Sequence, residues 1–174
     1  MNPRRKAAPS PAGSNVAPLY TPEQRARRDA TRWTLVQGVL APLQFLVCAI
    51  SALLVLRWLL TGEGWWVASA SFVLKTLLLY TIMVTGSVWE KAVFGRWLFA
   101  PAFFWEDVVS MLVLALHTAC LLAMVTGWLS PRAQMWLALT AYAAYVINAV
   151  QFVLKLRAAR RDAPLQLNPV EAMR

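Results

Sequence analysis

Charged residues are scarce in this chain of 174 residues: they make up 14% of it, against about 25% in soluble globular proteins. Hydrophobic residues make up 59%, and the mean hydropathy is +0.52. This balance excludes a soluble enzyme of this size and a chain that is disordered throughout.

Cysteine and histidine are scarce as well. The two cysteines, Cys48 and Cys120, both lie inside apolar runs, where a thiol is usually a small buried hydrophobic group. Two cysteines are too few for a disulfide scaffold. The single histidine, His117, has no second His or Cys at ligand spacing, so we expect no metal ion held by the protein itself.

The net charge of +9 comes from 17 basic and 8 acidic residues. Most of the basic residues lie before the first long apolar run or after the last one. A nucleic-acid-binding surface needs basic residues gathered on one folded face. We therefore expect no nucleic-acid partner and interpret the basic ends as a membrane topology signal.

Four apolar runs cover about residues 33–60, 65–88, 103–126 and 133–156. Each exceeds the roughly 20 residues that a helix needs to cross a bilayer core of ~30 Å. The sequence thus predicts an all-α, polytopic membrane protein with a bundle of four transmembrane helices at residues 19–162. Residues 1–18 are predicted to be a disordered basic arm and residues 163–174 a C-terminal tail. A Thr-Pro start at Thr21 predicts a short basic amphipathic helix before the first span.

Two independent patterns predict the orientation in the membrane. The two terminal segments and the connection 89–102 hold most of the Lys and Arg residues, and the side richest in them faces the cytoplasm. The nine tryptophans all lie near span ends, as in an aromatic belt. We expect both termini to be cytoplasmic.

Polar residues within the spans recur on single helix faces at ~100° per residue. The faces are Gln37, Gln44, Cys48 and Ser51; Thr76, Tyr80 and Ser87; Glu106, Ser110 and His117; and Asn148, Gln151 and Lys155. Such side chains either hydrogen-bond neighbouring helices or line a functional interior. Lys155 is predicted to extend to the membrane interface, and for Lys75 an outward and an inward direction both stay open.

Three acidic residues lie at the predicted cytoplasmic side, with Glu106 and Asp107 at the start of the third span and Glu90 at the end of the second. One interpretation is structural: charge matching at a helix start, and a surface ion pair of Glu90 with Lys91. The other is a general acid, because a carboxyl group at a dry boundary beside another acid tends to keep its proton. His117 lies about 16 Å deeper than Glu106 on the same face and is either a hydrogen-bonded core residue or an axial ligand for a metallated tetrapyrrole.

Several strings resemble one family closely. They are LYTPEQR (19–25), WTLVQG (33–38), LAPLQF (40–45), LYTIMVTGS (79–87), WEK (89–91), FGR (94–96), FAPAFFWED (99–107) and YVINA (145–149). The chain resembles the 3-vinyl bacteriochlorophyllide hydratases of bacteriochlorophyll biosynthesis. The resemblance implies a hydro-lyase that adds water to the C3 vinyl group of a Mg-chlorin and leaves a 1-hydroxyethyl group.

The same resemblance implies a bacterial inner membrane, cytoplasmic or intracytoplasmic, as the location. It implies no cofactor, since the magnesium belongs to the substrate, and it implies membrane lipid and other bacteriochlorophyll-synthesis enzymes as partners. A non-enzymatic membrane carrier or assembly factor for such pigments is the alternative. A four-span multidrug-type transporter is disfavoured because the first span has no embedded acid.

The residues predict a division of roles for such a reaction. Glu106 and Asp107 are the candidates for donating a proton and placing a water molecule, and Glu90 for orienting that water. His117 is the candidate ligand of the substrate magnesium, and Gln44, Tyr80 and Asn148 are candidates for bonding ring substituents. One tension follows: about 16 Å of helix between His117 and Glu106 exceeds the distance between a chlorin's metal and its vinyl group, so the two roles do not suit one pose.

Overall fold

The computed structural model describes residues 19–167, and the side chains of residues 19–160. The predicted arm at 1–18 and the last seven residues of the predicted tail lie outside the described residues. The described chain forms five helices and no strand: α1 (Pro22–Ala30), α2 (Arg32–Thr61), α3 (Trp65–Phe94), α4 (Phe104–Thr126) and α5 (Pro131–Leu167). The predicted all-α fold is confirmed.

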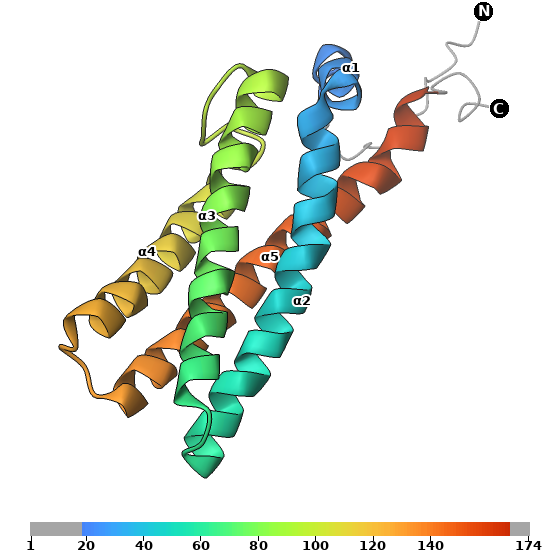
Figure 1. The fold of residues 1–174 in the computed structure, drawn as a ribbon. Coiled ribbons are helices and arrows are strands. Elements are labelled where there is room, and N and C mark those ends of the chain that lie inside the picture. Colours follow the sequence, from blue (N-terminus) through green and yellow to red (C-terminus); the bar gives the residue numbers. More distant parts are fainter. Residues whose placement is uncertain (1–18, 168–174) are drawn as a thin grey trace, which may run out of the picture.

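The four long helices form two antiparallel hairpins (Figure 1). α2 packs along α3 and α4 packs along α5, and the hairpins meet where α2 contacts α5 and α3 contacts α4. One end of the bundle, called here the α1 end, carries α1 and the connection 95–103. The short connections 62–64 and 127–130 lie at the opposite end.

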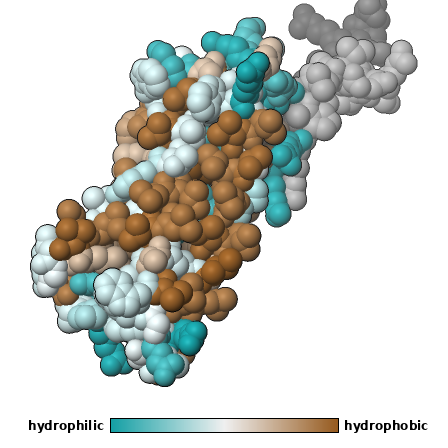
Figure 2. All heavy atoms as spheres, viewed as in Figure 1, coloured by the Kyte–Doolittle hydropathy of each residue, from teal (hydrophilic) through white to brown (hydrophobic). Residues whose placement is uncertain are grey.

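The outer surface of the bundle is apolar. Large hydrophobic side chains such as Leu35, Leu60 and Val84 are exposed, and hydrophobic residues cover the middle of the face seen in Figure 2, with hydrophilic residues mostly towards the ends. In each of the four long helices, at most 28% of the most apolar 18-residue stretch is buried inside the protein. Such a surface requires lipid around it, so the chain is a membrane protein with four candidate spans.

Two clusters fill the interior. The larger one lies among the four long helices and is built from small and branched side chains packed around Phe72 and Met135. The smaller one, called here the aromatic cluster, lies at the α1 end and consists of Tyr20, Val93 and Phe103 with Trp89, Phe94 and Phe152 around them. Because Phe103 immediately precedes α4, the aromatic cluster fixes where that helix begins.

The second span is longer than the hydropathy pattern predicts. The sequence predicts a connection at 89–102, but α3 continues to Phe94, and Gly95 ends it with φ of 81°, a left-handed conformation that glycine adopts without strain. The extra turns are stabilised because Trp89, Val93 and Phe94 pack in the aromatic cluster. Glu90 therefore lies on a rigid helix rather than in a loop.

The predicted start of α1 is confirmed. Thr21 accepts a hydrogen bond from the backbone N–H of Gln24, and the Gln24 side chain accepts one from the Thr21 N–H, with Pro22 in the first turn. Tyr20, just before this cap, is buried in the aromatic cluster. Burial raises the pKa of the Tyr20 hydroxyl, and the Arg28 guanidinium, 4.9 Å from the ring centroid, opposes the shift.

Replacing Thr21 by alanine is expected to destabilise α1 by about 1 kcal/mol, because the Gln24 N–H loses its acceptor. Hydrogen exchange of the α1 amides in membranes measures this, and the expected result is faster exchange in α1 alone. Thr126→Ala is the matched control, since that hydroxyl bonds only a carbonyl of its own helix at the opposite end. Unchanged exchange in the Thr21 variant would show that the cap does not hold α1.

Candidate active site

Three carboxyl groups are buried together at the α1 end. The exposed fraction is 5% for Glu90, 9% for Glu106 and 3% for Asp107. Glu90 comes from the last turns of α3, and the other two come from the first turn of α4. Ionised carboxylates are rarely buried without partners, so the contacts of each group decide its chemistry.

Glu90 and Asp107 form a pair. Their carboxyl groups interact with each other across the α3–α4 contact. Two ionised carboxylates side by side in a buried site repel each other, whereas a proton on one of them allows a hydrogen bond between the two. The pair is therefore a candidate for holding one exchangeable proton.

Backbone amides of the connection 95–103 complete the surroundings of the pair. Asp107 Oδ2 accepts a hydrogen bond of 2.8 Å from the Phe99 N–H, and Glu90 Oε2 accepts one of 3.1 Å from the Ala100 N–H. Phe99 has φ of 57°, which is uncommon for a bulky residue. The pair thus holds this connection in a strained turn, and the turn fixes the orientation of both carboxyl groups.

Glu106 has a different partner. Its Oε2 lies 2.6 Å from the Lys155 Nζ of α5, in a half-buried ion pair. Lys155 is predicted to extend to the membrane interface, and its ammonium lies at the α1 end of the bundle, where it pairs with the Glu106 carboxylate of the first turn of α4. The expected proximity of the Glu106 and Asp107 side chains is replaced by two separate pairs, since consecutive side chains diverge by ~100° around a helix.

The surface ion pair of Glu90 with Lys91 is not formed. Glu90 is buried against the connection 95–103, whereas Lys91 is exposed and its Nζ donates to the Gly95 carbonyl at 2.9 Å. Lys91 therefore stabilises the end of α3 and leaves the carboxyl pair without a neighbouring cation on that helix.

Several predicted polar faces form bonds between helices. They are Gln37 with Thr85 at 2.8 Å, Ser51 with Ser71 at 2.7 Å and with Tyr142 at 2.6 Å, Tyr80 with Thr118 at 2.8 Å, and Asn148 with Ser110 at 2.7 Å. The structural interpretation of Gln37, Ser51 and Ser110 is confirmed. Thr76 instead donates to the Phe72 carbonyl of its own helix. Of the candidate substrate-binding residues, Tyr80 and Asn148 thus form hydrogen bonds between helices, although the Asn148 Oδ1 has no partner among the described residues.

Three further polar residues lie completely enclosed in the middle of the bundle. The His117 Nδ1–H donates to the Val113 carbonyl, 2.9 Å away, and the His117 ring stacks on Phe72 at 5.5 Å. Gln44 and Lys75 have no exposed surface, so Lys75 points inward and its alternative outward direction is wrong. Within residues 19–160, no group of three or more His, Cys, Asp or Glu side chains is arranged to hold a metal ion.

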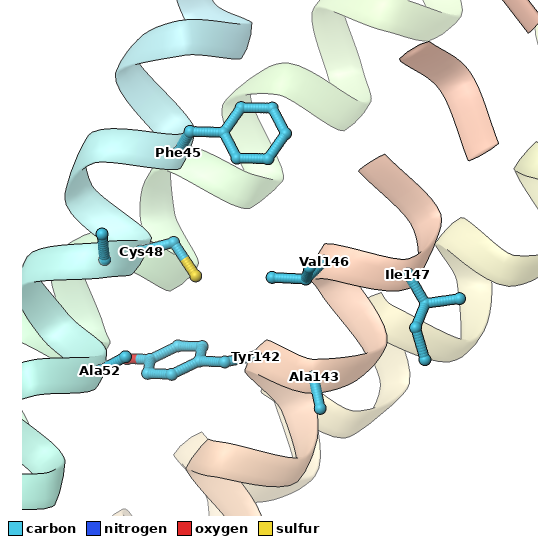
Figure 3. Close-up of a pocket in the computed structure, with 8 residues that line it drawn as sticks. Phe45, Cys48, Ala52, Tyr142, Ala143, Val146 and Ile147 are labelled. Atoms are coloured by element: carbon cyan, nitrogen blue, oxygen red, sulfur yellow. The ribbon is translucent and has the colours of Figure 1, made fainter. Parts of the chain in front are cut away.

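An apolar groove of about 470 Å³ lies between α2 and α5. Its walls are Phe45, Cys48, Ala49, Ala52, Tyr142, Ala143, Val146 and Ile147. Figure 3 shows Cys48 directed into the space between the two helices and the Tyr142 ring reaching across towards Ala52. This groove is not predictable from the sequence, because its signal is a set of alanines on α2 and α5 that face one another only through tertiary packing.

These features define a helical membrane protein of four candidate spans with a buried pair of carboxyl groups at one end of the bundle. The chain belongs to the 2-vinyl bacteriochlorophyllide hydratase family, whose model matches residues 20–158. The vinyl position numbered 2 in this name is position 3 in the current numbering of the macrocycle, so the family resemblance is confirmed.

Two relatives carry the same name. The protein of Cereibacter sphaeroides is 70% identical over 145 residues, which cover 83% of this chain and 89% of the relative. The protein of Rhodobacter capsulatus is 62% identical over 154 residues, which cover 88% of this chain and 90% of the relative. No solved structure matches the chain.

Proposed function

We propose that this protein adds water to the vinyl group of a bacteriochlorophyllide and forms a 1-hydroxyethyl group. Membership of the hydratase family supports the reaction. The observation that carries the mechanism is the buried, interacting pair of Glu90 and Asp107 at the α1 end, because hydration of an alkene begins with a proton transfer.

The pair donates its proton to the terminal vinyl carbon, which becomes the methyl carbon. The electron pair of the double bond forms the new C–H bond, and the positive charge left on the inner vinyl carbon is delocalised into the macrocycle. A water molecule then forms the C–O bond at that carbon and returns a proton to the pair. Atoms and charge balance, and the negative charge of the deprotonated pair stabilises the cation between the two steps.

Glu106 has a supporting role in this proposal. Its ion pair with Lys155 neutralises its charge, so the Glu90–Asp107 pair is the better proton donor. Ser110 lies about one turn of α4 deeper in the bundle than Asp107, and Asn148 is hydrogen-bonded to it. Asn148 is therefore a candidate for bonding a ring substituent, as is the Tyr80 hydroxyl.

His117 and Gln44 suit a different part of the bundle. Ten residues of α4 separate His117 from Asp107, about 15 Å along the helix. A pigment whose vinyl group meets the carboxyl pair does not reach His117 with its metal. We therefore keep His117 as a magnesium ligand only for a pigment held deeper, and unchanged pigment affinity in a His117→Ala variant would remove that role.

The α1 end is proposed to face the cytoplasm of a bacterial inner membrane, with both termini on that side. The basic residues of α1 and the connection 95–103 support this orientation. The proposed reaction needs no cofactor, since proton transfer and water addition are redox-neutral and the magnesium arrives within the substrate. Other enzymes of the same biosynthesis are the proposed partners for delivering and accepting the pigment.

Incubation of membranes containing the protein with a vinyl bacteriochlorophyllide tests the function. The expected product has gained the mass of one water molecule, and its long-wavelength absorption band moves to the blue because the vinyl conjugation is lost. Membranes without the protein are the control. Binding of the pigment without any conversion would contradict the hydratase proposal and favour a carrier.

A further inference from the structure

Lys75 is a buried cation at the depth of the hydrocarbon core. It lies ten residues into the 30-residue helix α3, about 15 Å from the start of that helix, and has no exposed surface. Its Nζ has no hydrogen-bond partner among the described residues and sits 3.8 Å from the centroid of the Tyr145 ring. A charged residue at this depth is costly and marks a functional site, and one of its known roles is the counter-ion of a ligand.

A second unpartnered group lies on the facing helix. Gln44 of α2 is fully buried, and neither its amide nitrogen nor its amide oxygen has a partner among the described residues. It lies one turn before Cys48 on the same face of α2, and Cys48 is within electrostatic range of Lys75. An ammonium group and an amide N–H₂ together are donors suited to an ionised carboxylate.

The groove between α2 and α5 adjoins these donors. Cys48 lines the groove and interacts with Lys75, and Phe45, another wall of the groove, contacts the Tyr145 ring at 5.7 Å. That same Tyr145 ring lies under the Lys75 ammonium. Lys75 and Gln44 do not line the groove themselves, and Cys48 and Phe45 connect them to it. An apolar groove beside an interior cation matches the chemistry of a large apolar ligand that carries one carboxylate.

We propose that Lys75, with Gln44, pairs with the carboxylate of a tetrapyrrole whose body lies in the α2–α5 groove, and that this is a second pigment site. The ligand class rests on the proposed function, because a bacteriochlorophyllide is a free acid. Fifteen residues of α3 separate Lys75 from Glu90, about 22 Å along the helix, which is more than the distance between the vinyl group and the carboxylate of one pigment. The second site therefore holds pigment from the lipid apart from the carboxyl pair.

Binding of the free-acid pigment and of its methyl ester to wild-type protein and a Lys75→Met variant tests the pairing. Wild type is expected to bind the acid at least about tenfold more tightly than the ester, as for a charge-assisted hydrogen bond. In Lys75→Met the acid is expected to bind no better than the ester. Lys91→Met, which changes an exposed lysine at the α1 end, is the matched control and is expected to keep the preference. A preference for the acid that persists in Lys75→Met would overturn the proposal.

The melting temperature gives a second measurement on the same variants. Pigment-free Lys75→Met is expected to melt higher than wild type, because an unpaired buried charge is replaced by an apolar chain of similar length. The acid pigment is expected to raise the melting temperature of wild type more than that of the variant. If Lys75→Met does not fold, Lys75→Gln replaces it with the same expected loss of preference. A pigment-induced rise that is equal in wild type and variant would contradict the pairing.

Two further outcomes separate this site from the others. An Asp107→Asn variant is expected to keep the preference for the acid, because the carboxyl pair is remote. If Asp107→Asn loses turnover but still prefers the acid pigment over the ester, both sites are supported. If wild type shows no turnover but still prefers the acid, only the hydratase mechanism is contradicted. Binding of oleate is measured on the same variants. If oleate binds wild type as tightly as the pigment does and does not bind Lys75→Met, the site belongs to a lipid carboxylate and the pigment proposal is overturned.

Discussion

Replacing Asp107 by asparagine is expected to lower the rate of vinyl hydration by about 10²–10⁴-fold. An amide cannot take up or release the proton that the Glu90–Asp107 pair shares. The Asn side-chain oxygen still accepts the Phe99 N–H, so the connection 95–103 keeps its conformation. Turnover of the vinyl pigment, measured together with pigment affinity, should show a loss in rate rather than in binding.

Matched variants make this prediction specific. Glu90→Gln is expected to cause a comparable loss, since it removes the other half of the pair. Glu106→Gln is expected to cause a smaller one, because that carboxylate is paired with Lys155. Glu63→Gln, the same change at an exposed position at the opposite end, should leave turnover as it is. Full turnover in both Asp107→Asn and Glu90→Gln would eliminate the pair as proton donor.

Replacing Phe103 by alanine is expected to reduce the free energy of unfolding by about 3–5 kcal/mol. The Phe103 ring is 2% exposed and contacts the rings of Tyr20, Trp89, Phe94 and Phe152, with centroids 5.7 to 6.4 Å away. Removing it leaves a cavity among groups that the ends of α3 and α5 hold in place. Since Phe103 directly precedes α4, turnover should fall as well when Asp107 loses its fixed position.

The neighbouring Phe104 provides the control for this prediction. Its ring is 42% exposed, so Phe104→Ala removes little buried contact and should change stability much less. Thermal or denaturant unfolding of the two variants in the same detergent gives the comparison. Equal stability of the Phe103 and Phe104 variants would show that the aromatic cluster does not carry the stability of the α1 end.

The spans could be predicted because lipid exposure imposes a strong rule on the sequence. Apolar runs of more than about 20 residues have few alternatives to a membrane helix, and the four runs coincide with parts of the four long helices, apart from Phe103, which directly precedes α4. The Thr21-Pro22 sequence predicts the start of α1 equally well, because a capping threonine followed by proline is typical of a helix N-terminus. The end of α3 was predicted too early because Glu90 and Lys91 interrupt the hydropathy, whereas Trp89 and Phe94 extend the helix by packing.

The members of the candidate site could be predicted but not their pairing. Glu90, Glu106 and Asp107 stood out as acids at a span end, and adjacency in sequence favoured Glu106 with Asp107. The partners are set instead by which helix lies opposite each residue: α3 brings Glu90 to Asp107, and α5 brings Lys155 to Glu106. The inward direction of Lys75 also depends on the position of Tyr145, which no pattern within α3 contains.

Infrared spectroscopy of the protein in membranes detects a proton shared by Glu90 and Asp107. At neutral pH, wild type and Glu106→Gln should both show the carbonyl band of a protonated carboxyl group, which moves in heavy water, and Glu90→Gln and Asp107→Asn should lose or displace it. A wild-type spectrum with carboxylate bands alone would contradict the account.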